Sequence, residues 1–362
     1  MNRQKDQVQP AQTEVFLQAI VGPLLAWYDQ NARTLPWREN TDPYRVWISE
    51  IMLQQTRVDT VIPYFERFID RLPTVQDLAD VSQEELFKLW EGLGYYTRAK
   101  NLKKGAQEIC SRFGGTFPQT PQQLLTVPGI GPYTAGAICS ICFEQPTPAV
   151  DGNVLRVITR LTADDADISA LSVRRRISQQ LAQIYPDSRR GDFTQSIMEL
   201  GAMICLPNGQ PKCESCPLNK QCRAYAEQTQ LLYPSAKPKK ERQVEHLTVF
   251  LLIDKEKELA VRKRTEKGVL NGLWELPNVQ GSLSEDQIHT LLDQWGVSFT
   301  KIEKAPQKKH IFTHKEWLMH CFAVHCCKSD LFTWVTPQQL QTQTALPTAF
   351  QKCLPARFRH SS

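Results

Sequence analysis

Residues 127–138 read VPGIGPYTAGAI, and the chain continues through CSICFEQPTPAV into DGNV at 151–154. Gly129 and Gly131 predict a tight turn between two helices, because glycine adopts positive φ without strain and leaves the neighbouring backbone N–H groups uncovered. A turn of this kind, placed before a helix N-terminus, can bind a phosphate group. An ordinary turn between helices has the same glycine pattern. The two glycines alone therefore leave both interpretations open.

A single carboxylate, Asp151, stands at the end of this apolar run, directly after Ala149 and Val150. An ionised carboxylate in a poorly solvated place is costly unless a charge or hydrogen-bond donors stabilise it. Asp151 is therefore a candidate for chemistry.

The periodicity of apolar residues divides the chain into two domains. From about Val15 to Ala226 they recur every three or four positions, as in VWISEIMLQQTRV and ELFKLWEGLG, with Pro and Gly clusters between them. The stretch QLLYPSAKPKKERQ has little periodicity, and after it the period changes to two, as in VEHLTVFLLID. We therefore expect a disordered tail at 1–12, an all-α domain at 13–228, a linker at 229–243 and an α+β domain at 244–362.

The composition limits the class of protein. The 362 residues are 41% hydrophobic, which fits two globular domains. No stretch approaches the roughly 18 apolar residues of a membrane helix, and the polar start lacks the apolar core of a signal peptide. We expect a soluble, cytoplasmic protein without membrane contact. Its eleven cysteines then favour reduced thiols or metal ligands over disulfides, and the net charge of +5 is only a mild bias toward polyanions.

Four of the cysteines gather in ICLPNGQPKCESCPLNKQC, namely Cys205, Cys213, Cys216 and Cys222. Four closely spaced thiolates that include a C-x2-C step suit a tetrahedral zinc site or a [4Fe–4S] cluster. The spacing does not separate these two. Four structural thiols are the remaining alternative, which is disfavoured because closely packed thiols near solvent tend to oxidise.

The order of hairpin, aspartate and four-cysteine loop resembles the helix-hairpin-helix DNA glycosylase superfamily of the endonuclease III type. Five segments are similar to its adenine-specific branch, the MutY family: PWRENTDPYRVWISEIMLQQTRV, WEGLGYYTRAKNL, VPGIGPYTAGAI, VDGNVLRV and ELGAMIC. The similarity extends over nearly all of residues 15–350. It implies a multidomain fold, with an all-α helix-hairpin-helix catalytic domain that has an iron–sulfur cluster loop, followed by an α+β Nudix-like domain.

The resemblance also implies ligands for a cofactor and for DNA. It favours a [4Fe–4S] cluster over zinc at the four cysteines, and it implies that Gly129 and Gly131 contact the DNA backbone. One departure lies in the cluster loop, where seven residues separate the first two cysteines and the family usually has six. The additional residue is expected to bulge outward without changing the ligands.

The family pattern implies catalytic roles for two carboxylates. Glu50 lies among apolar residues in VWISEIMLQQ, although sequence alone would allow it to face solvent on an amphipathic helix. By similarity, Glu50 has a raised proton affinity, protonates adenine at N7 and later deprotonates a water, while ionised Asp151 stabilises the oxocarbenium-like sugar. Tyr133 and Asn153 match further positions of this site. Tyr133 stands where bifunctional enzymes have the lysine that forms a Schiff base, so a monofunctional hydrolase is expected.

Further site positions rest on the similarity alone, and each is also compatible with packing or with a solvated face. The residues that match the adenine pocket are Trp37, Arg38, Val58 and Gln195. Those that match positions probing the opposite base are Gln55, Thr56, Leu93, Tyr95, Phe312, Thr313 and His314. The family has a serine where this chain has Thr313, which keeps the hydroxyl and adds a methyl group.

The metal-binding box of the second domain is incomplete. A working Nudix hydrolase needs G-x5-E followed by R-E-x2-E-E, whose carboxylates hold magnesium against a pyrophosphate. Gly272 is followed six residues on by Asn278, and Asp293 and Gln294 stand where two glutamates are required. We predict lesion recognition without pyrophosphate hydrolysis.

These patterns together predict a monomeric, monofunctional glycosylase that removes adenine opposite 8-oxoguanine or guanine in duplex DNA. For a bacterial source, it would act at the nucleoid in the cytoplasm. One alternative is another glycosylase of this fold that acts on thymine or damaged pyrimidines, which Tyr133 and the second domain disfavour. The other is a noncatalytic iron–sulfur DNA-binding protein or redox sensor, which the presence of both Glu50 and Asp151 disfavours.

Overall fold

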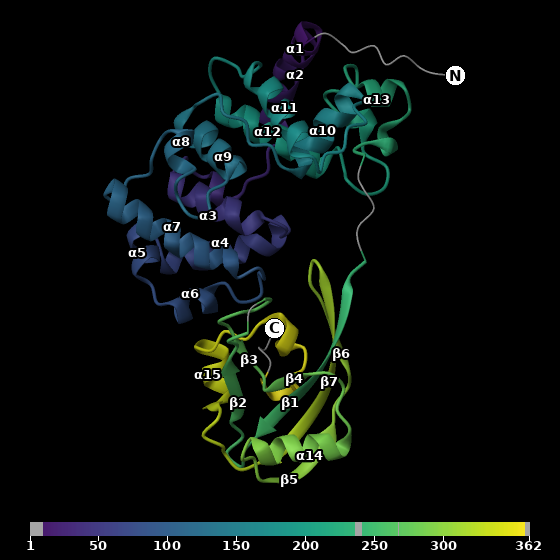
Figure 1. Cartoon of the computed structure of the whole chain (residues 1–362). Coiled ribbons are helices and arrows are strands. Elements are labelled where there is room, and N and C mark those ends of the chain that lie inside the picture. Colours follow the sequence, from purple (N-terminus) through teal and green to yellow (C-terminus); the bar gives the residue numbers. More distant parts are fainter. Residues whose placement is uncertain (1–9, 236–240, 267, 359–362) are drawn as a thin grey trace. The chain divides into compact units, whose positions relative to one another are not determined.

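The structure is a computed structural model that describes residues 10–235, 241–266 and 268–358. The chain divides into two compact units. The first contains the described residues up to 80 and from 101 to 235, and the second contains 81–100 and the described residues from 241 onward. Helices dominate the first unit, and a sheet with helices on it forms most of the second (Figure 1). The predicted fold class, an all-α domain followed by an α+β domain, is confirmed.

Two of the predicted boundaries fall partly on residues outside those described. The predicted tail at 1–12 falls mainly on residues outside those described, and the first helix begins at Pro10. The predicted linker at 229–243 includes residues 236–240, which are also outside them. The described part of this stretch contains a short 3-10 helix at Gln230–Leu232, and the first strand begins at Gln243.

The helices of the first unit surround an apolar core. The α-helices are α1 (Pro10–Gln18), α2 (Val21–Asn31), α3 (Pro43–Leu53), α4 (Val58–Arg71), α5 (Val75–Asp80), the larger part of α7 (Thr97–Phe113), α8 (Pro121–Leu124), α9 (Pro132–Phe143), α10 (Gly152–Thr162), α11 (Leu171–Ala182), α12 (Arg190–Met203) and α13 (Arg223–Ala226). The 3-10 helices are η1 (Pro36–Arg38), η2 (Cys213–Ser215) and η3 (Gln230–Leu232). One core cluster joins α2, α10, α11 and α12, four of the helices whose residues line the pocket described below.

The glycine turn connects α8 to α9, as the sequence predicts. Gly129 has φ +84°, and a Cβ there would lie 2.9 Å from the Cβ of Asn101, so both its conformation and its surroundings require glycine. Pro132 follows at the first position of α9, where a missing N–H costs nothing. Within α9, a Cβ on Gly136 would lie 2.3 Å from the carbonyl oxygen of Pro148. The segment that leads to Asp151 can pass this close only because residue 136 has no side chain.

A mixed eight-stranded sheet forms the centre of the second unit. Its strands are β1 (Gln243–Ile253), β2 (Leu259–Lys263), β3 (Trp274–Glu275), β4 (Asn278–Gln280), β5 (Phe299–Lys304), β6 (Lys308–Ile311), β7 (Lys315–Cys326) and β8 (Thr333–Val335). Strand β1 pairs in parallel with β7 over its whole length, from Gln243 opposite Lys315 to Ile253 opposite His325. The other pairings, β1 with β2 and β4, β2 with β3 and β8, and β7 with β5 and β6, are antiparallel.

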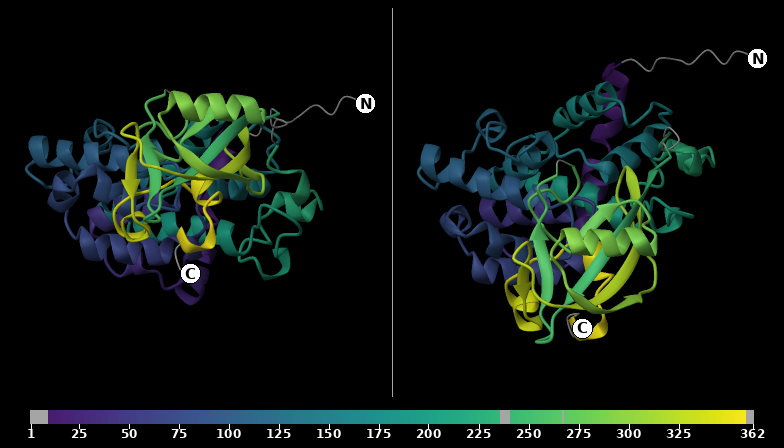
Figure 2. Two further views of the ribbon diagram at one scale, coloured as in Figure 1. Left: turned by 90° about the horizontal axis from the view of Figure 1, so that it is seen from below. Right: turned by 60° about the horizontal axis from the view of Figure 1, so that its bottom comes forward.

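Helices cover both faces of this sheet. Phe250 and Leu252 of β1 pack with Ile288 and Leu292 of α14 (Glu285–Gln294), which lies along one face (Figure 2). Residues 249, 251 and 253 point to the other face and pack with residues of α15 (Pro337–Thr342), α16 (Thr348–Gln351) and η4 (Ala356–Phe358). Because successive side chains of a strand alternate between faces, burial of both sets makes β1 a central strand.

Residues 81–100 belong to the second unit, although the helical pattern predicts the first domain for them. They include α6 (Gln83–Leu89). The carboxylate of Glu91 accepts hydrogen bonds from the backbone N–H of Leu346 at 2.8 Å and from the side chain of Gln351 at 2.9 Å. The ammonium group of Lys88 donates to the carbonyl of Leu340 at 2.9 Å. These partners are 252 to 260 positions apart, so no local pattern could have indicated them.

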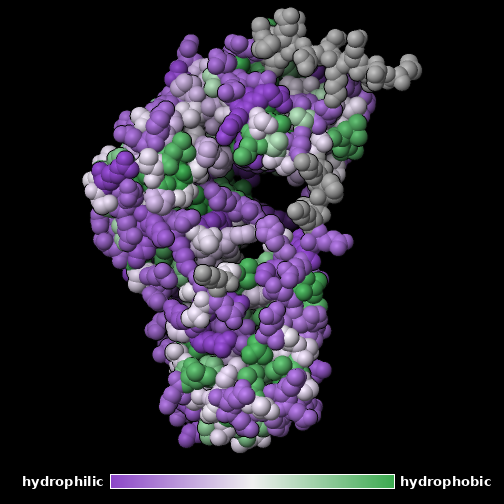
Figure 3. All heavy atoms as spheres, in the orientation of Figure 1, coloured by the Kyte–Doolittle hydropathy of each residue, from purple (hydrophilic) through white to green (hydrophobic). Residues whose placement is uncertain are grey.

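The visible surface of each unit is mostly hydrophilic, with apolar residues in small separate groups (Figure 3). Among the described residues, no helix is both long enough and apolar enough to cross a membrane.

Candidate active site

A pocket of about 760 Å³ lies in the first unit. Residues from α2, η1, α3, α4, α9, α10, α11 and α12 line it, together with residues of the loops between them. It brings together the residues predicted for catalysis and for the adenine pocket, with two of those predicted to probe the opposite base: Trp37, Arg38, Glu50, Gln55, Thr56, Val58, Tyr133, Asp151, Asn153 and Gln195. Gly129 and Gly131 lie in the turn before α9 and are not part of this wall.

Glu50 is a buried carboxylic acid. It lies on α3, which Asp42 caps by accepting the N–H of Tyr44, and its side chain is on the buried side of that helix with 6% of the residue exposed. The hydroxyl of Tyr133 donates a 2.5 Å hydrogen bond to Oε2 of Glu50. Burial raises the pKa of Glu50 to about 7, and the nearby Asp151 also raises it, while Tyr133 and Arg38 act in the opposite direction. A carboxyl group with this pKa can give up or take a proton near neutral pH.

Asp151 is the N-cap residue of α10. Its Oδ1 accepts the backbone N–H of Val154 at 2.8 Å, and its Oδ2 accepts the side-chain N–H of Asn153 at 2.8 Å. Burial raises the pKa of Asp151 above its usual value, and these hydrogen bonds and Arg156 offset only part of that rise. The helix N-terminus also favours an anion at this place. The isolated carboxylate is therefore stabilised by its own neighbours in the chain, because the start of α10 supplies the hydrogen-bond donors that an ionised Asp151 requires.

Arg156 connects this aspartate to the four-cysteine loop. Its Nη2 donates to the side-chain oxygen of Asn153 at 2.8 Å, and its Nε donates to the carbonyl of Cys205 at 2.7 Å. Since Asn153 in turn donates to Asp151, hydrogen bonds run without interruption from the first cysteine to the N-cap carboxylate. Sequence reasoning missed Arg156. The available signal was its position three residues after Asn153, which places both on one face of α10.

The four cysteines line one small cavity after the end of α12. All four are partly buried. Burial raises the pKa of Cys216 to about 12 and also raises the pKa values of Cys213 and Cys222. Arg160 donates to Sγ of Cys205 at 3.3 Å, so a positive charge faces the thiol set.

The loop between the first two cysteines contains an exposed bend. Residues 207–210 are exposed, with Gly209 at φ +72° in the bend. The N–H of Lys212 donates to the carbonyl of Ile204 at 3.0 Å and closes the loop before Cys213.

The residues predicted to probe the opposite base are divided between the units. Gln55 and Thr56 line the pocket of the first unit, and the other five belong to the second. There the hydroxyl groups of Tyr95 and Thr313 lie 2.8 Å apart and share a hydrogen bond. Tyr95 is 47% exposed, whereas Leu93 is 6% exposed.

The two neighbours of Thr313 differ in their surroundings. The ring of Phe312 packs edge-on against His310 and Trp317, with centroids 4.6 and 4.8 Å away. The carbonyl of His314 accepts the N–H of Gln243 at 3.2 Å, so the loop is fixed to the start of β1.

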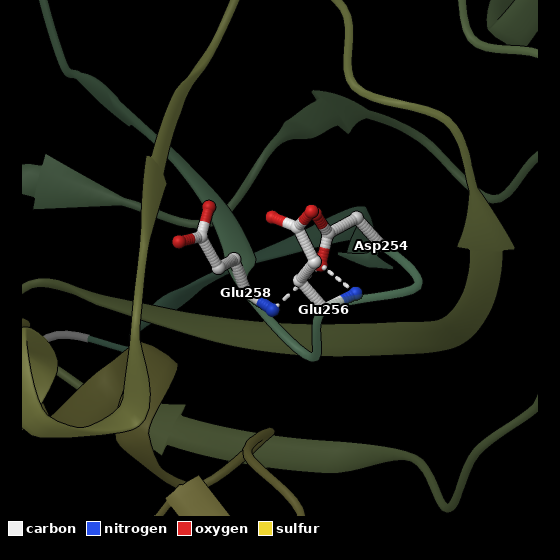
Figure 4. Close-up of side chains that lie close together, drawn as sticks. All are labelled: Asp254, Glu256 and Glu258. Carbon is white, nitrogen blue, oxygen red and sulfur yellow. Dashed lines mark hydrogen bonds between the residues drawn. The ribbon is translucent and has the colours of Figure 1, made fainter.

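Three carboxylates of the second unit, Asp254, Glu256 and Glu258, lie close together at the turn between β1 and β2 (Figure 4). Oδ1 of Asp254 accepts the N–H groups of Glu256 and Glu258 at 3.0 and 2.7 Å, which shapes the turn. The ammonium group of Lys328 lies 2.6–3.4 Å from all three carboxylates. The shape of the turn and the ammonium group of Lys328 therefore explain why these three carboxylates lie close together. The incomplete Nudix box is elsewhere: Asn278 is buried in β4, and Asp293 lies on α14.

The comparisons with known proteins cover both units of the chain. Residues 48–183 match the family model described as HhH-GPD superfamily base excision DNA repair protein, and residues 248–356 match that of the NUDIX domain. An adenine DNA glycosylase of Mus musculus is 35% identical over 91% of this chain and 76% of its own length. One of Buchnera aphidicola subsp. Schizaphis graminum is 38% identical over 83% of this chain and 84% of its own length.

Two solved structures are similar to the helical part. A thermostable thymine-DNA glycosylase is 27% identical, with a TM-score of 0.53, and covers 59% of this chain and 99% of its own. An endonuclease III bound non-covalently to DNA is 24% identical, with a TM-score of 0.51, over 59% of this chain and 97% of its own, which shows the shared fold. The relatives that match along both units decide between the branches of that fold. The chain belongs to the adenine DNA glycosylase family, with a helix-hairpin-helix base-excision domain followed by a Nudix-like domain.

Proposed function

We propose that the protein hydrolyses the N-glycosidic bond of adenine opposite 8-oxoguanine or guanine in duplex DNA. The observation that supports this most is the pair of carboxyl groups in one pocket: Glu50, with a pKa of about 7, and Asp151, held by two hydrogen bonds at a helix N-terminus. Glycosidic cleavage needs an acid for the leaving group and an anion for the cationic sugar. The two different environments support this division of roles.

The reaction begins with an adenosine turned out of the duplex into the pocket, which costs a few kcal/mol and is easier at a mispair. Protonated Glu50 donates its proton to N7 of adenine, so the base departs as a neutral molecule. Asp151 opposes the positive charge that develops on the sugar. Glu50, now ionised, takes a proton from the water that attacks the sugar carbon, which restores the acid for the next cycle. Tyr133 orients the Glu50 carboxyl group through its hydrogen bond.

The test is a single-turnover assay on a duplex with one adenine:8-oxoguanine pair. We expect release of adenine from this duplex and from an adenine:guanine duplex, and none from an adenine:thymine control. The same assay on thymine:guanine pairs and oxidised pyrimidines separates this function from that of other glycosylases of the fold. Binding to the duplex without release of any base would instead support a noncatalytic DNA-binding protein.

We further propose that Cys205, Cys213, Cys216 and Cys222 hold a [4Fe–4S] cluster, which would act as a structural cross-link of this loop. The residues present fit such a cluster: all four cysteines line one small cavity, and Arg160 donates to Sγ of Cys205 at 3.3 Å, so a positive charge faces the thiolates.

Metal analysis tests the cluster. We expect an anaerobic preparation to be yellow-brown and to contain about four irons per chain. Cys216→Ser should lose most of the iron, because one corner of the cluster loses its ligand. The control is Cys327→Ser, which changes an exposed cysteine of the other unit and should keep full iron content. Stoichiometric zinc without iron would contradict the proposal.

Tyr133 predicts the absence of efficient strand cleavage. A phenol cannot form an imine with the sugar, so the enzyme should release adenine and leave an intact abasic strand. The measurement is borohydride trapping of protein on its substrate, with an authentic bifunctional endonuclease III as positive control. Trapping of this protein in stoichiometric amount, at the rate of base release, would contradict a monofunctional mechanism.

We propose that the second unit recognises the opposite base and that Tyr95 and Thr313 act in it together. Thr313→Val removes the hydroxyl that bonds Tyr95 but keeps the shape of the side chain. One hydrogen bond contributes about 1 kcal/mol, which corresponds to roughly a fivefold loss of preference for adenine:8-oxoguanine over adenine:guanine. Thr313→Ser is the matched control and should change little. The readout is the ratio of single-turnover rates at equal salt. An unchanged ratio in Thr313→Val would remove this contact from recognition.

A further inference from the structure

Glu199, the first residue of the ELGAMIC segment, is a buried carboxylate at the wall of the catalytic pocket, and no role was predicted for it. It lies on α12, with 1% of the residue exposed. Arg33 donates to both of its oxygens, from Nε at 2.6 Å and from Nη2 at 2.9 Å. Arg38 donates from Nη2 at 3.0 Å. Both oxygens of Glu199 are therefore fixed by guanidinium groups.

The same contacts fix the orientation of Arg38. Besides Glu199, its guanidinium bonds the carbonyl oxygen of Arg33 through Nη1 at 3.3 Å. A guanidinium has five N–H donors in a rigid plane, so two contacts on different nitrogens set the direction of the others. Arg33, Arg38 and Glu199 all line the pocket that contains Glu50 and Asp151.

These three side chains carry one net positive charge. Burial raises the pKa of Glu199, but the hydrogen bonds from Arg33 and Arg38 outweigh it and bring the pKa down to about 2. Glu199 is thus ionised at any pH at which the protein works. Without its negative charge, the pocket wall would carry two uncompensated guanidinium groups.

The net charge of Arg33, Arg38 and Glu199 affects the proton affinity of the proposed general acid, Glu50. A positive charge near a carboxyl group favours the ionised form, and Arg38 acts on Glu50 in this direction. When a carboxylate is bound to a guanidinium, the two charges largely cancel at a distance. The paired guanidinium therefore acts more weakly on a distant charge than an unpaired one does. Glu50 must hold a proton before it can donate one.

We propose that Glu199 is a positioning residue for the reaction: it joins Arg33 and Arg38 into one fixed group with a single net charge, so that Arg38 faces the base and Glu50 keeps its proton. This inference rests on the proposed glycosylase function.

Other titratable and charged groups face the same region. Around the arginines and Glu199 they are Tyr28 from α2, Asp59 from α4, and Arg189 and Asp192 at the start of α12. Around Glu50 they are Tyr133 and Cys142 from α9, and Asp151. All of them remain in place in the variants described next, so only the charge of the arginine–Glu199 group differs.

The experiment measures single-turnover release of adenine from an adenine:8-oxoguanine duplex between pH 5 and 9. In the wild-type protein the rate should fall at high pH as Glu50 loses its proton. Glu199→Gln raises the net charge of the group by one, so we expect the midpoint of this fall to move about one unit lower. Arg33→Gln lowers the net charge by one and should move it higher. Arg33→Gln/Glu199→Gln restores the net charge and should return the midpoint to the wild-type position.

The control is Glu144→Gln. This carboxylate binds the N–H groups of Arg190 and Gly191 at the start of the same helix α12 but does not line the pocket. Glu144→Gln should affect thermal unfolding, but the pH midpoint of the fall in rate should stay at the wild-type value. If Glu199 had only a structural role, Glu199→Gln would release adenine more slowly by the same factor at every pH. The double variant would then not release adenine faster than Glu199→Gln.

A wild-type midpoint in Glu199→Gln would overturn the inference. So would a double variant that keeps the midpoint of that single variant. If Glu199→Gln does not fold, Arg33→Gln still decides, because an unchanged midpoint in it would also overturn the inference. If the wild-type protein releases no adenine, the proposed function itself is wrong.

Discussion

Asp151→Asn is expected to lower the single-turnover rate of adenine release by about 10³-fold while duplex binding is retained. The substitution removes the charge that opposes the cationic sugar but keeps the shape of the side chain. Oδ1 can still accept the N–H of Val154, so the start of α10 should be preserved. Fluorescence anisotropy with an adenine:8-oxoguanine duplex measures binding, and rapid quench measures excision.

The matched control is Asp42→Asn. Asp42 is the N-cap residue of α3, where it accepts the N–H of Tyr44, and it does not line the pocket. An amide there should keep both the cap and the activity. If Asp151→Asn released adenine at a near-normal rate, Asp151 would have no part in the mechanism, and the anion opposite the sugar would have to be sought elsewhere.

The local features of the site were predictable because they depend on short stretches of sequence. Gly129 and Pro132 mark the turn and the start of α9, and the apolar run before Asp151 indicates a buried approach to a helix start. The change of period after the linker separates the helical unit from the sheet. By contrast, the prediction that Glu50 acts together with Asp151 depended on the family pattern. The apolar neighbours of Glu50 in the sequence do not show which side of α3 it occupies.

The remaining features depend on residues far apart in the chain. Arg156 meets Cys205 49 positions later, and Arg33 meets Glu199 166 positions later. The parallel pairing of β1 with β7 joins residues 72 positions apart, such as Gln243 and Lys315. Periodicity identifies strands and faces but not partners. Glu199 had one local signal, since it lies four residues after Gln195 and so on the same face of α12.

Glu50→Gln is expected to abolish adenine release, with a loss of about 10⁴-fold or more, because an amide can neither donate the proton to N7 nor accept one from water. The same variant should be more stable than the wild-type protein at high pH. Burial raises the pKa of Glu50 from 4.5 to about 7. At about 1.4 kcal/mol per unit, this corresponds to roughly 3 kcal/mol.

The sign of the stability effect follows from proton linkage. Below pH 4.5 Glu50 is protonated in both folded and unfolded chains, so the substitution should change the free energy of unfolding little. Between pH 4.5 and 7 the unfolded chain loses this proton and the folded protein keeps it, so the wild-type protein loses stability as pH rises. Above pH 7 the full difference of roughly 3 kcal/mol in favour of Glu50→Gln is expected.

Urea unfolding at pH 4.5, 6 and 8 measures this difference. The control is Glu108→Gln, a partly exposed position on α7, which should show none of it. Loss of activity with a pH-independent change in stability would mean that Glu50 titrates normally in the folded protein. In that case the acid that protonates adenine would be a different group. Loss of activity together with a stability gain that grows from pH 4.5 to 8 would show that the folded protein keeps this carboxyl group protonated at a cost to its stability, for use in catalysis.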